Sequence, residues 1–398
     1  LSGVRARLAS CRLSNCASVD SKVSSPDLRT RIVSDEAEWD AIRPAWVDLH
    51  GASPAASPFL RFGWLRRWWQ WFGPTYGEDG LRLITIWQDG ALAGVLPLYV
   101  ATGHAGFRLR CLRFVSTGEA EFEETCPEYL DLLSRPGVEA ACAAAAWKAI
   151  DGMRWDTLEL LDVPAESVLL RHRPSGAAAV PFSTGTCPIA DLQGGFDAYL
   201  SRLSSNSRQT ARRLLRAAQA PGVQFSLVDS AGLHPAFTEM VELHRERWAA
   251  EGKPGAFSSA RFTDFHRSLV EAWLPDASAV IARLSFYDTP FALVYGFVTD
   301  RRFYLYQSGV KRETEGPFRS PGNLAHLLLM RTLADRGIVA YDFLKGAATY
   351  KDRLATTATG LVGIRLRRPT LRNAASWPFQ MAGRLAHRGI DLANGVRP

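Results

Sequence analysis

Cysteine is scarce and unpatterned in this chain of 398 residues. The six cysteines form no C-x-x-C pair and have no zinc-ligand spacing, which excludes a disulfide scaffold and a zinc-binding fold. We therefore expect reduced thiols, a cytoplasmic protein and no metal cofactor.

Long apolar runs are missing as well. The two longest, residues 91–100 and 140–150, contain Pro97 and Lys148 and are shorter than the roughly 20 residues that a membrane helix needs. Residues 1–30 are rich in serine and arginine but have no apolar core of a secretory signal. We expect them to be a disordered leader, with a transit peptide as the alternative.

The body of the chain also lacks a large charge of one sign. Lys+Arg 47 against Asp+Glu 40 gives a net charge of +7, and most of this excess comes from the arginines of residues 361–398. A nucleic-acid-binding fold carries its basic stripe on core elements, so no nucleic-acid partner is expected. The basic tail, residues 367–398, either docks on the body or makes a peripheral contact with an anionic membrane.

Two stretches of the chain repeat one order of predicted elements. A strand, a turn and a second strand at residues 81–100 recur at 280–298. A helix followed by a strand at 138–160 recurs at 323–344, and the strand contains an aspartate in both copies. A duplicated domain explains the recurrence.

The fold class that follows is α+β, with a mixed, mostly antiparallel sheet flanked by helices in each of two tandem domains. We expect the N-terminal domain at residues 31–172 and the C-terminal domain at 191–366, joined by a Pro/Gly/Ala-rich linker at 173–190. Further helices are predicted at residues 64–72, 196–219, 234–250 and 259–273.

One segment of the second copy carries most of the chemical information. Residues 303–307 predict a strand, which leads through a polar loop to the start of an apolar helix. Ser320 suits the N-cap of that helix and Pro321 its first helical position. Because Gly322 removes a side chain where helix N–H groups point outward, this segment is either an anion cradle or an ordinary helix start.

Three sequence runs together resemble a known family. They are SPFLRFGWLRRWWQWFG from Ser57, LHRERWAAEGKPGAF from Leu243 and SPGNLAHLLLMRTLADRGIVAYDFLKGAATYKDRLA from Ser320. The chain resembles, over most of residues 31–365, the GNAT-type acyltransferases that include CelD-like proteins of bacterial cellulose and exopolysaccharide clusters. That family is related to the FemABX peptidoglycan transferases. The resemblance implies two tandem GNAT-like domains, with acetyl-CoA or another acyl-CoA bound in the second.

The resemblance also implies which residues hold the acyl-CoA. GNAT proteins bind pyrophosphate through an R/Q-x-x-G-x-G/A loop, to which Arg319, Gly322 and Leu324 correspond. Leu324 departs from the small residue of that pattern. Ser320 and Asn323 belong to the same expected site. The strand that contains Tyr306 and Gln307 is expected to offer an open edge to the pantetheine amides.

Amide formation requires a proton acceptor for the amine and donors for the developing oxyanion and thiolate. Asp342, at the end of a predicted strand, is either that acceptor, an orienter of the amine or a carboxylate that caps a neighbouring loop. Tyr350 and Lys351, placed after Gly346, either donate to the leaving sulfur or bind an anionic acceptor.

Helical spacing places further candidates on one face. His244 shares a helix face with Arg247 or Trp248, so these side chains can line one acceptor cavity, although a helical histidine is often structural. Tyr304 projects to the same side of its strand as Tyr306, where the hydroxyls either reach a thioester or pack in the core. His326 is assigned to the core.

The function expected from these features is an N-acyltransferase. It would move an acyl group from CoA directly to an amine of a small-molecule, amino-sugar or polysaccharide or envelope precursor. No Ser-His or Cys-His motif indicates a covalent intermediate. Two alternatives stay open: an aminoacyl-tRNA-dependent transferase of the FemABX type, and a non-catalytic accessory protein of exopolysaccharide synthesis.

Overall fold

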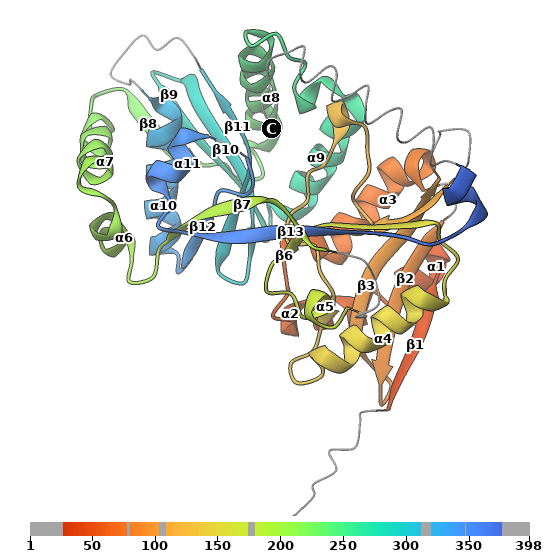
Figure 1. Cartoon of the computed structure of the whole chain (residues 1–398). Coiled ribbons are helices and arrows are strands. Elements are labelled where there is room, and N and C mark those ends of the chain that lie inside the picture. The colour runs from red at the N-terminus through yellow and green to blue at the C-terminus, as the bar shows by residue number, and fades with distance from the viewer. Residues whose placement is uncertain are drawn as a thin grey trace, which may run out of the picture.

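The computed structural model describes residues 27–77, 80–102, 109–173, 180–311, 320–346 and 348–375. Its strands form one 13-stranded sheet of order β1-β2-β3-β4-β6-β13-β7-β12-β11-β10-β9-β8, with β5 paired to β3 (Figure 1). Most neighbouring strands are antiparallel, and helices cover the sheet. The predicted α+β class with a mixed sheet is confirmed. Arg319 and the tail beyond residue 375 lie outside the described residues, as does nearly all of the predicted leader.

The first half consists of β1 (Leu28–Val33), α1 (Glu36–Ala41), α2 (Arg43–Ala52), α3 (Phe62–Tyr76), β2 (Leu81–Gln88), β3 (Ala91–Thr102), β4 (Arg110–Phe114), β5 (Leu133–Ser134), α4 (Glu139–Gly152), β6 (Thr157–Pro164) and α5 (Val168–Arg171). The second half consists of β7 (Phe182–Asp191), α6 (Phe196–Arg202), α7 (Ser205–Ala217), β8 (Val223–Leu227), α8 (Leu233–Ala249), α9 (Ala260–Trp273), β9 (Ala279–Phe286), β10 (Thr289–Thr299), β11 (Arg302–Val310), α10 (Pro321–Asp335), β12 (Ala340–Asp342), α11 (Thr349–Leu354) and β13 (Thr357–Arg367).

The repeated order of elements is present in both halves. Each half has an edge strand, a set of helices, a hairpin and a third strand, which pairs in parallel with the strand that follows the next helix. In the first half this parallel pair is β4 with β6, and in the second it is β11 with β12. Asp156 precedes β6 whereas Asp342 ends β12, so the two aspartates lie at opposite ends of corresponding strands.

The last strand joins the two halves of the sheet. Residues 182–190, which composition assigned to a linker, form most of β7, and β7 pairs with β12 on one side and β13 on the other. The last strand, β13, pairs with β6 of the first half and runs from one half into the other (Figure 1). The sheet is therefore continuous. Local sequence does not contain this pairing, because both partners are distant along the chain.

The hairpin turns follow from residues that tolerate left-handed backbone. Asp89 and Gly90, with φ of 50° and 80°, connect β2 to β3 as predicted. The turn between β9 and β10 is Tyr287 and Asp288, with φ of 43° and 67°, and it lies within the strand, turn and strand predicted at residues 280–298. The helix predicted at 196–219 is divided into α6 and α7, because Leu203 ends α6 in extended backbone and Ser204 caps the N–H of Ser207 in α7.

The second half of the sheet has a different layer on each face. Helices α6, α7, α10 and α11 cover one face, and α8 and α9 lie on the other (Figure 1). The α8 and α9 face shares its core with aromatic residues of α3, including the fully buried Trp64 and Trp68. In the described residues no helix is long and apolar enough to cross a membrane.

Candidate active site

Strands β11 and β12 separate after a short parallel contact. They pair only from Arg302 to Tyr304 on β11, whereas β11 continues to Val310. On its other edge Tyr295 pairs with Gln307 and Gly296 with Leu305, so Tyr306 is the extra residue of a β-bulge. A bulge bends its strand, and this one occurs just where the two strands part. We call the opening between residues 305–310 of β11 and the end of β12 the fork.

The bulge depends on a glycine opposite it. A Cβ atom at Gly296 would lie 2.2 Å from the Tyr304 carbonyl oxygen, a separation that real Cβ atoms do not show. Close backbone packing between β10 and β11 therefore requires glycine at position 296, beside the bulge.

We expect Gly296→Ala to lower the free energy of unfolding by about 3 kcal/mol, because the new methyl group must push two strand backbones apart. Gly360→Ala, in β13, is the matched control, since its added Cβ would meet only the Ala165 methyl at 3.9 Å. Denaturant unfolding monitored by tryptophan fluorescence compares the two. Equal stability of both variants would show that the bulge tolerates a side chain.

A loop of the first half spans the fork. The Tyr306 hydroxyl donates to the Thr125 carbonyl oxygen at 2.6 Å, and the Tyr129 hydroxyl donates to Asp342 Oδ2 at 2.5 Å. Residues 125–129, the bridging loop, therefore contact both β11 and the end of β12. Cys126 and Tyr129 have φ of 41° and 59°, which is strained backbone for residues other than glycine.

The bridging loop buries a carboxyl group that sequence reasoning missed. Glu128 is 4% exposed, and in the described part of the chain its Oε2 atom has no hydrogen-bond partner. Burial raises the pKa of this carboxyl to about 8, with Asp162 and Asp342 adding to the rise and Lys345 and Lys351 opposing it. The sequence signal was an acidic run of five glutamates between residues 119 and 128, outside the half that we expected to bind acyl-CoA.

Asp342 lies at the base of the fork with both oxygens occupied. It is fully buried; Oδ1 accepts from the Leu344 N–H at 2.8 Å, and Oδ2 accepts from Tyr129 and lies 3.7 Å from the Arg302 guanidinium. Burial raises its pKa to about 6 despite these contacts. The bond to Leu344, whose φ is 55°, holds the turn that ends β12. This is the loop-capping geometry that the sequence left open.

Tyr350 and Lys351 contact different partners. Lys351 is 9% exposed, and its Nζ atom donates to the Leu344 and Lys345 carbonyl oxygens at 3.1 and 2.7 Å. Within the described residues one of its three protons therefore remains available. Burial lowers its pKa. The ring of Tyr350 stacks on His326 at 5.2 Å. His326 is buried as predicted, on the α10 face of the sheet.

His244 and Trp248 contact each other across one turn of α8. The Trp248 indole N–H donates to His244 Nε2 at 2.9 Å, which leaves the proton of a neutral imidazole on Nδ1. In the described residues Nδ1 has no hydrogen-bond partner. Burial, with smaller effects of Arg247 and Arg245, lowers the pKa to about 4, and the interaction with the Gln307 side chain opposes this shift. His244 is thus a neutral hydrogen-bond donor. Arg247 is half exposed and pairs with Glu251.

The tyrosines of β11 reach the α8 side of the sheet, as their spacing predicted. Tyr304 is 4% exposed and its ring packs against Tyr129 and Phe59. Tyr306 and Gln307 are half-buried at the open edge of β11. Tyr304 and Tyr306 therefore both contact the bridging loop.

The start of α10 lies at the far end of β11. Pro321 is the first helical residue and Ser320 the N-cap, as predicted, but the Ser320 side chain makes no capping bond, so the first N–H groups of α10 have no acceptor from this residue. A Cβ at Gly322 would lie 3.2 Å from the Val310 side chain, so glycine lets the helix approach the end of β11 closely. Asn323 lines a cavity of about 420 Å³ between α7, α10 and α11.

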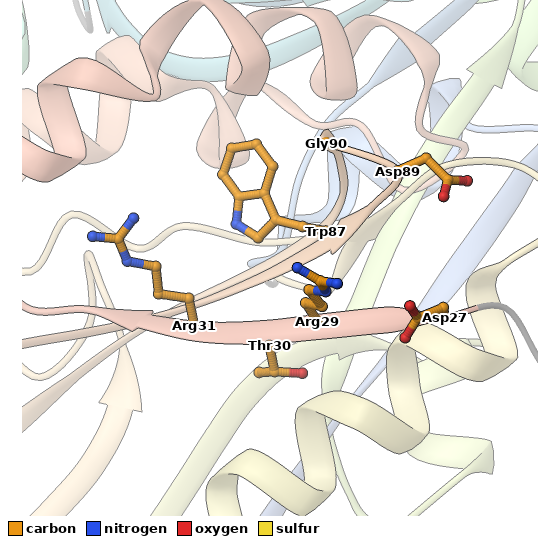
Figure 2. Close-up of a pocket in the computed structure, with 7 residues that line it drawn as sticks. All are labelled: Asp27, Arg29, Thr30, Arg31, Trp87, Asp89 and Gly90. Atoms are coloured by element: carbon orange, nitrogen blue, oxygen red, sulfur yellow. The ribbon is translucent and has the colours of Figure 1, made fainter.

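Another hollow lies on the far edge of the sheet and is separate from the fork. It has a volume of about 510 Å³ beside β1 and is lined by Trp87 and by charged side chains (Figure 2). Asp27, Arg29, Arg31 and Asp89 are all exposed there. Without a buried polar group it carries no catalytic argument. Among the described residues no group of His, Cys, Asp or Glu is arranged to hold a metal ion.

Comparison with known proteins agrees with this geometry. Residues 205–352, which include β11, the fork, α10 and Lys351, match the family model of the acetyltransferase (GNAT) domain. The second half of the chain is thus similar to the GNAT acetyltransferase domain over these residues, in agreement with the sequence resemblance. No curated protein sequence matches the chain significantly.

Solved structures share the whole two-half fold. A conserved protein of unknown function from Bacteroides thetaiotaomicron is 12% identical with a TM-score of 0.55, over 85% of this chain and 100% of that one. FemX is 12% identical with a TM-score of 0.51, over 83% and 96%. The C-terminal domain of a putative lysylphosphatidylglycerol synthetase from Agrobacterium fabrum is 13% identical with a TM-score of 0.50, over 88% and 96%. At these identities the similarity establishes the fold alone. The narrower CelD-like assignment stays a prediction.

Proposed function

We propose that this protein is an acyl-CoA-dependent N-acyltransferase that acylates an amine of a small molecule, an amino sugar or another polysaccharide or envelope precursor. The observation that carries the proposal is the fork: a strand edge held open by a bulge inside a GNAT acetyltransferase domain.

The residues around the fork fit a CoA thioester. The free edge of β11 offers unpaired backbone N–H and C=O groups to the pantetheine amides, as in strand addition. The uncapped N-terminus of α10, next to the end of β11, suits the pyrophosphate. When bound, acyl-CoA would supply the activated acyl group.

The side chains at the fork then have separate tasks. Asp342 and Lys351 hold the turn after β12 and so fix the width of the fork. The free Nζ proton of Lys351 and the Nδ1–H of His244 are donors for the carbonyl oxygen or the leaving sulfur. The hydrogen bond from Tyr306 to Thr125 fixes the bridging loop on the side of the fork from which the acceptor amine would approach.

A cationic acceptor suits the surroundings of the bridging loop. Glu124 is exposed immediately before it. Its charge attracts an ammonium group over a distance of about 10 Å at 0.1 M ionic strength. This favours an amine over a carboxylate or phosphate acceptor.

Calorimetry with acetyl-CoA, CoA and pantetheine tests the cofactor part. We expect CoA to bind at least tenfold more tightly than pantetheine, because only CoA carries the pyrophosphate for the α10 N-terminus. Thiol release from acetyl-CoA is then followed with glucosamine, galactosamine, ethanolamine and lysine as amines.

Each other result contradicts the proposal in a different way. Tight CoA binding without thiol release for any amine would favour the accessory role. Absence of CoA binding, together with transfer from aminoacyl-tRNA, would favour a transferase of the FemABX type. Equal affinity for CoA and pantetheine would mean that the N-terminus of α10 does not bind the pyrophosphate.

A further inference from the structure

The active site of the second half is completed by a residue of the first. We propose that Glu128, on the bridging loop, accepts the proton of the attacking amine. This inference rests on the proposed acyltransferase function and adds a proton acceptor that the acetyltransferase domain at residues 205–352 does not itself contain.

The position of Glu128 follows from its neighbours in the bridging loop. Thr125, three residues before it, is bonded to Tyr306 on β11, and Tyr129, directly after it, is bonded to Asp342 at the end of β12. These two hydrogen bonds connect the bridging loop to both sides of the fork, and Glu128 lies in sequence between the two bonded residues. A group in that place is next to the point where the two strands part.

The burial of Glu128 indicates a ligand. A carboxyl oxygen without a hydrogen-bond partner costs several kcal/mol when it is taken out of water, so such groups are rare in a packed interior. Glu128 is only 4% exposed and its Oε2 has no partner in the described chain. The residues that flank it, Cys126 and Tyr129, also hold strained backbone. Strain and an unpartnered buried acid at one place are typical of a functional site.

The other acceptors near the fork are occupied. Both oxygens of Asp342 accept hydrogen bonds, and His244 Nε2 accepts from Trp248. The Tyr306 hydroxyl donates its proton to Thr125. Among these groups only Glu128 has a buried oxygen, Oε2, without any hydrogen-bond partner in the described residues, and burial raises the pKa of this carboxyl to about 8, close to the pH at which a proton acceptor works best.

The proton balance of the reaction is then complete. The acceptor arrives as an ammonium ion and gives one proton to Glu128. The neutral amine attacks the thioester carbonyl carbon, the C–N bond forms and the C–S bond breaks. The second proton of the nitrogen goes to the departing thiolate, so the products are an amide and CoA thiol. Glu128 returns its proton to solvent before the next turnover.

The test compares Glu128→Gln, Glu128→Asp and, as the matched control, Glu121→Gln from the exposed acidic run. Thiol release from acetyl-CoA is measured from pH 6 to 9.5 with whichever of the four amines the wild type uses fastest. We expect Glu128→Gln to lower kcat/KM at least 100-fold and to change acetyl-CoA affinity less than twofold. Glu128→Asp should retain more activity than Glu128→Gln, and Glu121→Gln should match the wild type.

The pH profile distinguishes the titration of Glu128 from the titration of the amine. The ratio of wild-type to Glu128→Gln activity should rise with pH and level off above about 8, since the titration of the amine is common to both enzymes and cancels. A pH-independent ratio, or a Glu128→Gln enzyme within threefold of the wild type, would overturn the assignment while leaving the acyltransferase function intact. A wild type that neither binds acetyl-CoA nor releases thiol would overturn the proposed function and this inference with it.

Discussion

Replacing Glu128 with glutamine is expected to make the protein progressively more stable than the wild type as the pH rises. Burial raises the pKa of Glu128 from 4.5 to about 8. Between these two values the folded protein keeps a proton that the unfolded chain has released, so wild-type stability falls with increasing pH by about 1.4 kcal/mol per unit. Glutamine stays neutral throughout. The free energy of unfolding of Glu128→Gln relative to the wild type should therefore grow by about 2–4 kcal/mol between pH 5 and pH 8.

Urea unfolding at half-unit steps from pH 5 to 8.5 measures this difference. The buried amide has a desolvation cost of its own, but that cost does not depend on pH, so the slope is the diagnostic quantity. Glu121→Gln removes an exposed carboxyl from the same run and should follow the wild type at each pH. A pH-independent difference for Glu128→Gln would mean that the Glu128 carboxyl is ionised in the folded protein at neutral pH. A gain of stability combined with a loss of turnover is what a functional acid predicts, whereas a structural acid would lose both.

Most single elements of the fold could be predicted because their signals are local. The Asp89–Gly90 turn and the apolar periodicity of α8, α9 and α10 are contained in short windows, and those elements begin and end within two residues of the prediction. The pairing of β7 with β13, and of β13 with β6, could not be predicted in this way. Pro188 and four other glycines and prolines within residues 173–190 indicate a linker, and only contacts with β12 and β13 make residues 182–190 a strand.

The candidate site likewise combines features that local sequence predicts with features that depend on distant contacts. Contacts between His244 and Trp248 follow from helical spacing, and the free edge of β11 follows from the family resemblance. Tyr350 and Lys351 are adjacent in sequence, yet Tyr350 stacks on His326 while Lys351 binds the turn after β12. Adjacent helix positions point about 100° apart, so a shared motif does not imply a shared cavity.

Glu128 was missed because its role depends on tertiary structure alone. Nothing in its local run distinguishes it from Glu121, which is exposed. It becomes unusual only when Tyr306 and Asp342, from the other half of the chain, hold the bridging loop across the fork.

Replacing His266 with phenylalanine is expected to make the protein resistant to mild acid. His266 of α9 is fully buried, its Nε2 has no hydrogen-bond partner in the described residues, and aromatic rings of Trp64, Phe262 and Tyr306 surround it. Burial lowers its pKa far below 6.5. The unfolded chain binds a proton at His266 below pH 6.5 and the folded protein does not, so this stability is complete above 6.5 and is lost as the pH falls.

The comparison of variants isolates this one histidine from the other titrating groups. Buried carboxyls such as Asp131, whose pKa rises to about 6, act in the opposite direction, but they are common to every variant and cancel in the difference. Between pH 6.5 and 4.5 the wild type should therefore lose about 1.4 kcal/mol per pH unit more than His266→Phe does. His234→Gln changes an exposed histidine and should lose stability in parallel with the wild type. Parallel curves for the wild type and His266→Phe would mean that the folded protein protonates His266 as readily as the unfolded chain. The imidazole ring of His266 would then not be enclosed in the aromatic core that it shares with Tyr306 of the fork.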